Sequence, residues 1–233
     1  LFIKYLSLSK LIFIYRKIIF KFYINNEEQA EDESQGDSRG RIRQCTARFF
    51  GGFDYAADDV TKSDFVKLAY AKGVPMGGDL KPGSGKAPTF LVMALKDPRS
   101  GNLDRVQIVK GWLDAAGESH EQVVDIACAD GLLPDAQSGR CPDNGASVDM
   151  SNCQVSTDKG AAELKVLWRD PQFDASQSAF YYVRVLQNPT CRWSSYDALR
   201  LGIEHRARGA HHPGTGLELA DLLLLVFVGV VLA

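Results

Sequence analysis

The stretch PTFLVMALKDPRSGNLDRVQIVKGWLDAAGESHEQVVDIACA, residues 88–129, decides the fold class of this chain. It holds three apolar runs, joined by links rich in turn-forming residues: Pro88–Lys96, Arg105–Leu113 and Glu121–Ala129. The first run is almost wholly apolar, which is typical of a strand buried on both faces. Because links this short favour antiparallel neighbours, the stretch predicts a meander of these three strands.

Two further strand-like runs follow an irregular stretch from Asp130 to Gly160. In Ala162–Trp168 apolar and polar residues alternate, which predicts a strand with one buried face. Ala179–Gln187 is rich in aromatic and branched residues, and we expect it to pair with the preceding strand across the turn between them.

Two short helices complete the predicted domain. Thr61 is expected to cap the first helix, and Gly73 to end it in a left-handed conformation. Ser194 is expected to cap the second helix, which Gly202 stops. The elements together predict a mainly β, α+β fold: an antiparallel β-sandwich or a curled sheet with two short helices.

The two ends of the chain differ from its middle. The first 24 residues contain five cations and no acid, and these cations exclude a membrane-spanning helix. The next 16 residues contain six acids and no aromatic residue, as in a disordered linker. The Ile, Phe, Lys, Tyr and Asn bias of the first residues is also typical of translated AT-rich, non-coding DNA. We therefore divide the chain into a disordered or mistranslated segment 1–40, a β-rich domain 41–202 and an apolar tail 203–233.

The cysteines favour a disulfide in the irregular stretch, because a loop of this length is unusual unless it is tied down. The simplest pair is Cys141–Cys153, and Cys128–Cys141 is the alternative. The chain has five cysteines, and Cys45 and Cys191 are expected to be reduced and buried. A disulfide would place the protein in an oxidising compartment.

No complete catalytic motif is present in the sequence. The glycine-rich KPGSGKAP, residues 81–88, lacks the first glycine and the final Ser or Thr of a phosphate-binding loop. His120 is the only histidine of the predicted β-rich domain, and its aspartates lack EF-hand spacing. The net charge of −2 gives no basic balance, so we expect no nucleic-acid partner. We also expect no cofactor in this chain.

Several long strings resemble one family, in the family's order: RFFGGFDYA (48–56), KGVPMGGDL (72–80), residues 88–114 and residues 167–198. They are similar to the domain of unknown function 3604 family, and the similarity runs from about Arg48 to Gly202. Full-length members of the family carry an upstream barrel-like domain similar to the polymerase-and-histidinol-phosphatase metal-dependent hydrolases.

The resemblance implies that the His and Asp metal ligands lie in that upstream barrel, and that a divalent metal would be bound there. This chain resembles the C-terminal part only, so no ligand can be assigned to it, and the upstream barrel is its expected partner. Many members are exported bacterial proteins, which implies a periplasmic or secreted location. Whether this chain alone is an enzyme stays open.

The candidate substrate-binding residues are Asp79, Arg192 and Trp193. The glycines before Asp79 allow a ligand to approach the backbone closely, and Arg beside Trp can bind anions and stack. A structural turn and a pair at the edge of the core are the alternatives. On this interpretation the chain shapes the substrate side of a hydrolase-like protein and supplies no catalytic residue.

Two other functions are compatible with the sequence. An independent module that binds glycans or small ligands would use exposed aromatic side chains such as Trp193. A membrane-tethered protein would use the apolar tail as its anchor. However, Leu222–Ala233 has only 12 residues, fewer than the 18 or so that a spanning helix needs, so we expect no true membrane span.

The apolar tail itself has a simpler explanation. If the codons of residues 210–222 are read one base further along, they are compatible with the string PTIQERAWSSPI. That string is similar to the ending of the family. We therefore predict a frame change between Gly202 and Ala210, which would leave residues 203–233 without a selected function.

Overall fold

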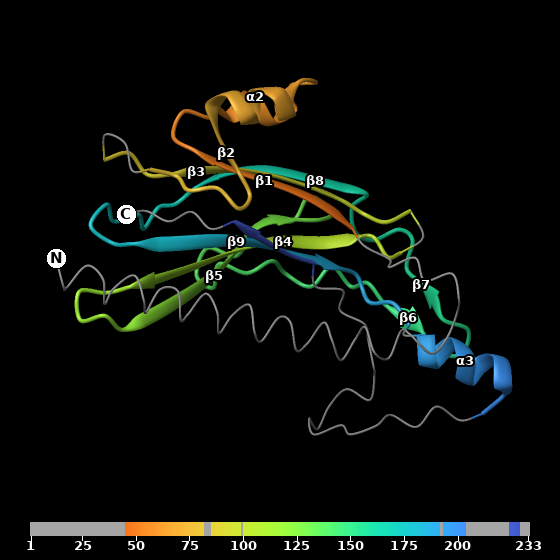
Figure 1. Cartoon of the computed structure of the whole chain (residues 1–233). Helices are drawn as coiled ribbons and strands as arrows, with labels where there is room; N and C mark the ends of the chain where they lie inside the picture. The colour runs from red at the N-terminus through yellow and green to blue at the C-terminus, as the bar shows by residue number, and fades with distance from the viewer. Residues whose placement is uncertain (1–44, 82–84, 99, 192, 204–223, 229–233) are drawn as a thin grey trace.

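The computed structural model of the chain describes residues 45–81, 85–98, 100–191, 193–203 and 224–228. Two antiparallel sheets are stacked face to face; one helix lies on the outer face of the first sheet and another lies beyond the end of the sandwich (Figure 1). The predicted fold class, mainly β with an antiparallel sandwich and two short α-helices, is confirmed.

The first sheet has the strand order β2–β1–β3–β8. Its strands are β1 (Thr46–Gly52), β2 (Gly73–Pro75), β3 (Thr89–Leu95) and β8 (Glu163–Arg169). Strand β1 was not predicted, although it lies between β2 and β3 and pairs with both. Its sequence TARFFGG ends in two glycines that allow close packing, and this pattern lacks the strict alternation of a half-buried strand.

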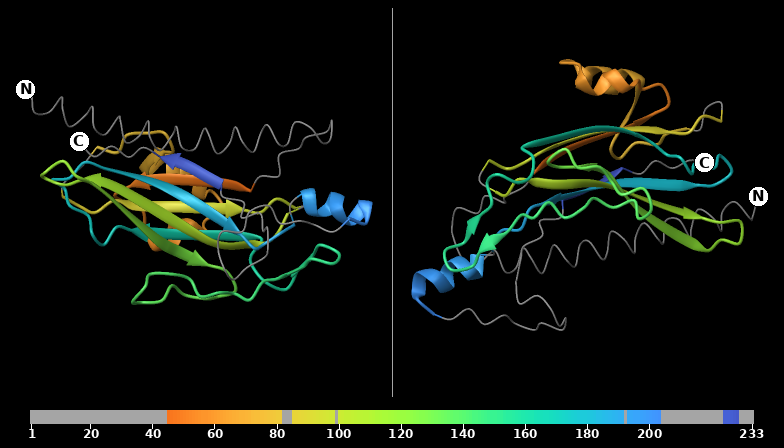
Figure 2. Two further views of the ribbon diagram at one scale, coloured as in Figure 1. Left: turned by 90° about the horizontal axis from the view of Figure 1, so that it is seen from below. Right: turned by 180° about the vertical axis from the view of Figure 1, so that it is seen from behind.

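The second sheet has the order β10–β9–β4–β5. Its strands are β4 (Leu103–Leu113), β5 (Ser119–Cys128), β9 (Ala179–Gln187) and β10 (Leu224–Val228). Seen from below, β5 and β10 form the two edges of this sheet (Figure 2). The irregular stretch contains a short hairpin of β6 (Val148–Asp149) and β7 (Gln154–Val155).

The strand pairings correct two predictions. The hairpin of β4 and β5 is formed, but β3 pairs with β1 and β8 in the other sheet, so the three strands are not one meander. The predicted pairing of β8 with β9 is also wrong, because β8 pairs with β3 and β9 pairs with β4. In both cases the link crosses from one sheet to the other, about 10 Å away.

Aromatic residues fill the space between the sheets. Phe90 stacks on Phe49 and Trp168 at centroid distances of 5.3 and 6.0 Å, and Tyr181 lies 4.5 Å from the same ring. On the other face of β3, Leu91 is buried in a separate cluster under the helix. Strand β3 is therefore buried on both faces, as its apolar run predicted.

The first helical region differs from its prediction at both ends. A short 3₁₀ helix, η1 (Ala57–Thr61), precedes the α-helix α2 (Phe65–Lys72), so Thr61 ends η1 and does not cap α2. Gly73 is extended and continues into β2, instead of adopting a left-handed conformation. A Cβ at Gly73 would lie 2.2 Å from the Tyr55 hydroxyl oxygen, so close packing explains this glycine.

The last helix is close to its prediction. Helix α3 (Trp193–Leu201) begins one residue before Ser194, which therefore lies inside the helix and is not its cap. Gly202 follows with a φ of +61°, as expected for a glycine that ends a helix. At this end of the sandwich α3 lies next to β6 and β7 (Figure 1).

The predicted segment 1–40 lies outside the described residues. Of the predicted tail 203–233, only Ile203 and β10 are described. The backbone of β10 pairs antiparallel with β9. Ladder hydrogen bonds come from the backbone and require no particular side chains, so this strand does not test the predicted frame change. In the described part of the chain, no helix is long and apolar enough to cross a membrane.

Candidate binding cleft

A cleft of about 360 Å³ opens beside β5. Its walls come from three places in the sequence: Gln122–Val124 on β5, the loop Ala136–Gly139, and the end of β8 with its following turn. That last wall consists of Trp168, Pro171 and Gln172. The volume lies in the range of pockets that bind small ligands.

The loop wall is held in shape by Asp135. Its carboxylate accepts hydrogen bonds from the Gln137 and Ser138 backbone N–H groups and from the Ser138 hydroxyl. The bond from the Ser138 N–H contributes most to holding the pKa of Asp135 below its usual value. Gly139, with a φ of +65°, closes the turn through a bond from its N–H to the Asp135 carbonyl. The loop therefore has one defined shape next to the cleft.

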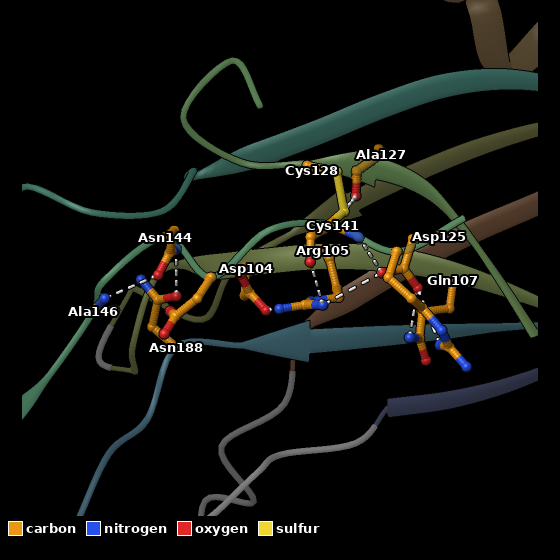
Figure 3. A network of polar contacts seen from close by, with 12 residues as sticks. Asp104, Arg105, Gln107, Asp125, Ala127, Cys128, Cys141, Asn144, Ala146 and Asn188 are labelled. Carbon is orange, nitrogen blue, oxygen red and sulfur yellow. Dashed lines mark hydrogen bonds and ion pairs between the residues drawn. A yellow bond between two sulfur atoms is a disulfide. The ribbon is translucent and has the colours of Figure 1, made fainter. Parts of the chain in front are cut away.

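The same loop is attached to the second sheet through Asp125. This carboxylate is buried, and it accepts hydrogen bonds from the Cys141 backbone N–H at 2.7 Å and from the Gln107 amide at 2.7 Å (Figure 3). Arg105 and Arg140 pair with it at 3.3 and 3.4 Å. Burial of a carboxylate is costly unless it is paired and hydrogen-bonded. These four partners meet that requirement, so the cluster fixes the loop against β4 and β5.

A disulfide reinforces this attachment. Cys141 is bonded to Cys128 at the end of β5, and Cys153 is bonded to Cys191. The predicted pair Cys141–Cys153 is therefore wrong, and its alternative Cys128–Cys141 is formed. The prediction that Cys191 is reduced is also wrong, because the residue lies just before α3 and is bonded to Cys153 in the turn between β6 and β7. Cys45 is reduced and buried, as predicted.

The opposite wall is held by a buried ion pair inside the sandwich. The Lys110 ammonium on β4 donates to the Asp170 carboxylate at 2.6 Å and to the Gln172 carbonyl at 2.8 Å. The Tyr181 hydroxyl donates to the same carboxylate at 2.6 Å. Burial, together with Asp170, raises the pKa of Tyr181, so this hydroxyl keeps its proton. The Lys110 ammonium is thus satisfied and anchors the turn that carries Gln172.

Trp168 joins the core to the cleft. Its ring stacks on Phe90 inside the sandwich, yet the residue is only partly buried and contributes to the cleft wall. This aromatic side chain is therefore fixed in orientation before any ligand binds. Trp168 ends the strand that was predicted to have one buried face, and the structure places its ring against both the core and the cleft.

The predicted binding residues do not meet at this cleft. Asp79 is exposed in the loop that follows β2 and is not part of the cleft wall. Arg192 lies outside the described residues, and Trp193 begins α3 with a side chain outside the description. In the described part of the chain, no group of three or more His, Cys, Asp or Glu side chains is placed to hold a metal ion.

Comparison with known families identifies the family of this chain. The family described as Protein of unknown function (DUF3604) matches residues 33–214. The chain belongs to this family. The match contains the whole cleft and every described strand of the DUF3604 chain except β10. No curated protein and no solved structure matches the chain.

The matched region of the DUF3604 chain is wider than the predicted domain 41–202 at both ends. The sequence contained little signal for the cleft itself, because its walls come from three separate segments. One usable signal was the sequence DAQSGRC, residues 135–141, where Asx-turn residues stand next to a cysteine.

Proposed function

We propose that this chain is the β-rich C-terminal part of an exported, metal-dependent hydrolase-like protein, and that its own contribution is to bind a ligand rather than to transform it. The metal ligands and the divalent metal belong, in this proposal, to an upstream barrel-like domain. Membership of the DUF3604 family supports the proposal through the resemblance described above, which implies an upstream hydrolase-like barrel in full-length members.

The observation that carries the binding role is the chemistry of the cleft. All its lining residues are uncharged, and hydrogen bonds hold the loop wall and the wall that carries Gln172. Behind the wall that carries Gln172, the buried side chains of Lys110 and Asp170 form an ion pair with each other. Such a cleft can hold a ligand in place, but its lining offers no acid, base or ionised nucleophile to react with it.

The two disulfides support export. Structural disulfides form and persist in oxidising compartments, such as the bacterial periplasm or the extracellular space. Both bonds tie down the long irregular stretch, and one of them fixes a wall of the cleft. We therefore propose a periplasmic or secreted location. The frame change between Gly202 and Ala210 remains part of the proposal, and the DNA sequence of residues 203–233 tests it directly.

The binding role can be tested with the purified chain. We would titrate the ¹⁵N-labelled protein with small neutral, cationic and anionic fragments, and follow the backbone amides of Val123, Ser138 and Gly139. We expect shifts centred on these amides that are unchanged by EDTA. Phosphodiester hydrolysis with added Zn²⁺ or Mn²⁺ is expected to be absent. A hydrolysis rate that Asp79→Ala abolishes would show that catalysis does reside in this chain.

A further inference from the structure

We infer that the cleft beside β5 binds a neutral carbohydrate. The inference rests on the proposed binding role and adds the chemical class of the ligand. Three amide side chains, Gln122, Gln137 and Gln172, line the cleft, and in the described structure they make no hydrogen bond of their own. Each amide offers two donors and an acceptor oxygen. This is the combination that the adjacent hydroxyl groups of a sugar need, since each hydroxyl both donates and accepts.

Trp168 provides the apolar surface that completes such a site. One side of a pyranose ring carries C–H groups and packs favourably on an indole ring, which combines a large apolar surface with a defined orientation. Stacking on Phe90 at 6.0 Å fixes the ring of Trp168 from the core side. Pro171 and Val123 extend the apolar part of the wall next to it.

The electrostatics of the cleft disfavour charged ligands. No lining side chain carries a charge, so a phosphate or carboxylate would lose its hydration without gaining an ion pair. The Lys110 ammonium behind this wall is already bonded to Asp170 and to the Gln172 carbonyl. A polar but uncharged ligand avoids this desolvation penalty.

The rigidity of the walls favours binding of a ligand that makes only a few hydrogen bonds. Asp135 holds the Gln137–Ser138 turn, and Asp170 accepts a bond from the Gln172 backbone N–H at 2.8 Å. The backbones that carry Gln137 and Gln172 are therefore ordered before the ligand arrives. This reduces the entropy lost on binding.

The test uses four neutral tetrasaccharides: β-1,4-linked glucose, N-acetylglucosamine and mannose, and α-1,4-linked glucose. Each would be titrated into the full, disulfide-intact chain by calorimetry and by ¹⁵N NMR, with a sulfated tetrasaccharide as the charged probe. We expect at least one neutral probe to bind with a dissociation constant below about 1 mM. The shifts should centre on the amides of Val123, Ser138 and Gly139.

Variants locate the site. Gln137→Ala and Gln172→Ala are each expected to weaken binding about three- to tenfold, because each removes one or two hydrogen bonds to the ligand. Both residues are exposed, so neither change should unfold the protein. Gln154→Ala on β7 is the matched control, since this exposed glutamine lies outside the cleft and should leave affinity unchanged.

Four results would overturn the inference. Tighter binding of the sulfated probe than of every neutral one would show that the cleft selects charge. Unchanged affinity in both cleft variants would place the carbohydrate elsewhere. If no tetrasaccharide shifts the cleft amides although other fragments do, the ligand class is wrong but the binding role stands. If no probe of any class shifts them, the binding role fails as well.

Discussion

The buried pair of Lys110 and Asp170 allows a sharp test of how the sandwich is held together. Both side chains are almost fully buried, at 6% and 1% exposure, and their charged atoms are 2.6 Å apart. Lys110→Met removes the ammonium but keeps most of the length of the unbranched side chain. The Asp170 carboxylate would then stay buried with only the Tyr181 hydroxyl and the Gln172 N–H as donors.

We expect Lys110→Met to lower the free energy of unfolding by about 3–5 kcal/mol, the range for removing one partner of a buried ion pair. Asp170→Asn should be destabilising for the converse reason, since it leaves the ammonium without a counter-charge. The double variant Lys110→Met/Asp170→Asn carries neither charge. Its loss of unfolding free energy should be smaller than the sum of the losses of the two single variants, by a coupling energy of about 2 kcal/mol.

The measurement is urea unfolding of the disulfide-intact protein at pH 7, followed by tryptophan fluorescence and far-UV circular dichroism. Coincident transitions from the two probes justify a two-state analysis. The control is the surface pair Lys86–Asp54, whose side chains are 54% and 73% exposed at a distance of 3.0 Å. Lys86→Met should change stability by no more than about 1 kcal/mol.

Two outcomes would refute the reasoning about this pair. If Lys110→Met costs no more than Lys86→Met, water reaches the pair and burial does not govern its energy. If the single losses of Lys110→Met and Asp170→Asn add up to that of the double variant, the two charges do not stabilise each other. In either case the pair could not serve as the anchor of the Gln172 turn.

Three further predictions follow from separate features. Replacing both cysteines of the Cys128–Cys141 bond by serine should destabilise the protein by about 3 kcal/mol in urea unfolding, as loop closure predicts for its separation of 13 residues; an unchanged midpoint would contradict this. A hydrogen bond from the Ala56 N–H, and then bonds from Lys62 and Lys72, hold the pKa of Asp59 below its usual value. The folding stability that the ionised Asp59 contributes is therefore complete above about pH 4, and it is lost as the pH falls toward the lower pKa of the folded state. Asp59→Asn should therefore lower Tm at pH 7, and calorimetry should show a smaller difference from the parent at pH 2. Gly160 has a φ of +84°, and a Cβ there would lie 2.5 Å from Asn188, so Gly160→Ala should lower the free energy of unfolding by about 1–3 kcal/mol. The loss should exceed that of Gly145→Ala, where a Cβ meets nothing within 4 Å. Equal losses would show that only the backbone conformation matters.

The sequence by itself determined where five of the ten described strands lie, namely β3, β4, β5, β8 and β9, and how some of them are buried. The apolar run of β3 predicted burial on both faces, and the alternation in β8 predicted one buried face. The short link between β4 and β5 predicted their hairpin, and Gly202 predicted the end of α3. These features are local, since side-chain periodicity and turn residues act over a few neighbouring positions.

The tertiary structure alone decided which strands are neighbours, which cysteines pair and where the cleft forms. Alternation shows which face of a strand is apolar, but either sheet of a sandwich can accept that face. The links after β3 and β8 are long enough to cross the roughly 10 Å between the sheets, so a short separation in sequence did not guarantee pairing. The cleft depends on the same crossings: β8 reaches the edge of β5 only because it joins the opposite sheet, and this placement brings Trp168 and Gln172 next to Gln122 and Gln137.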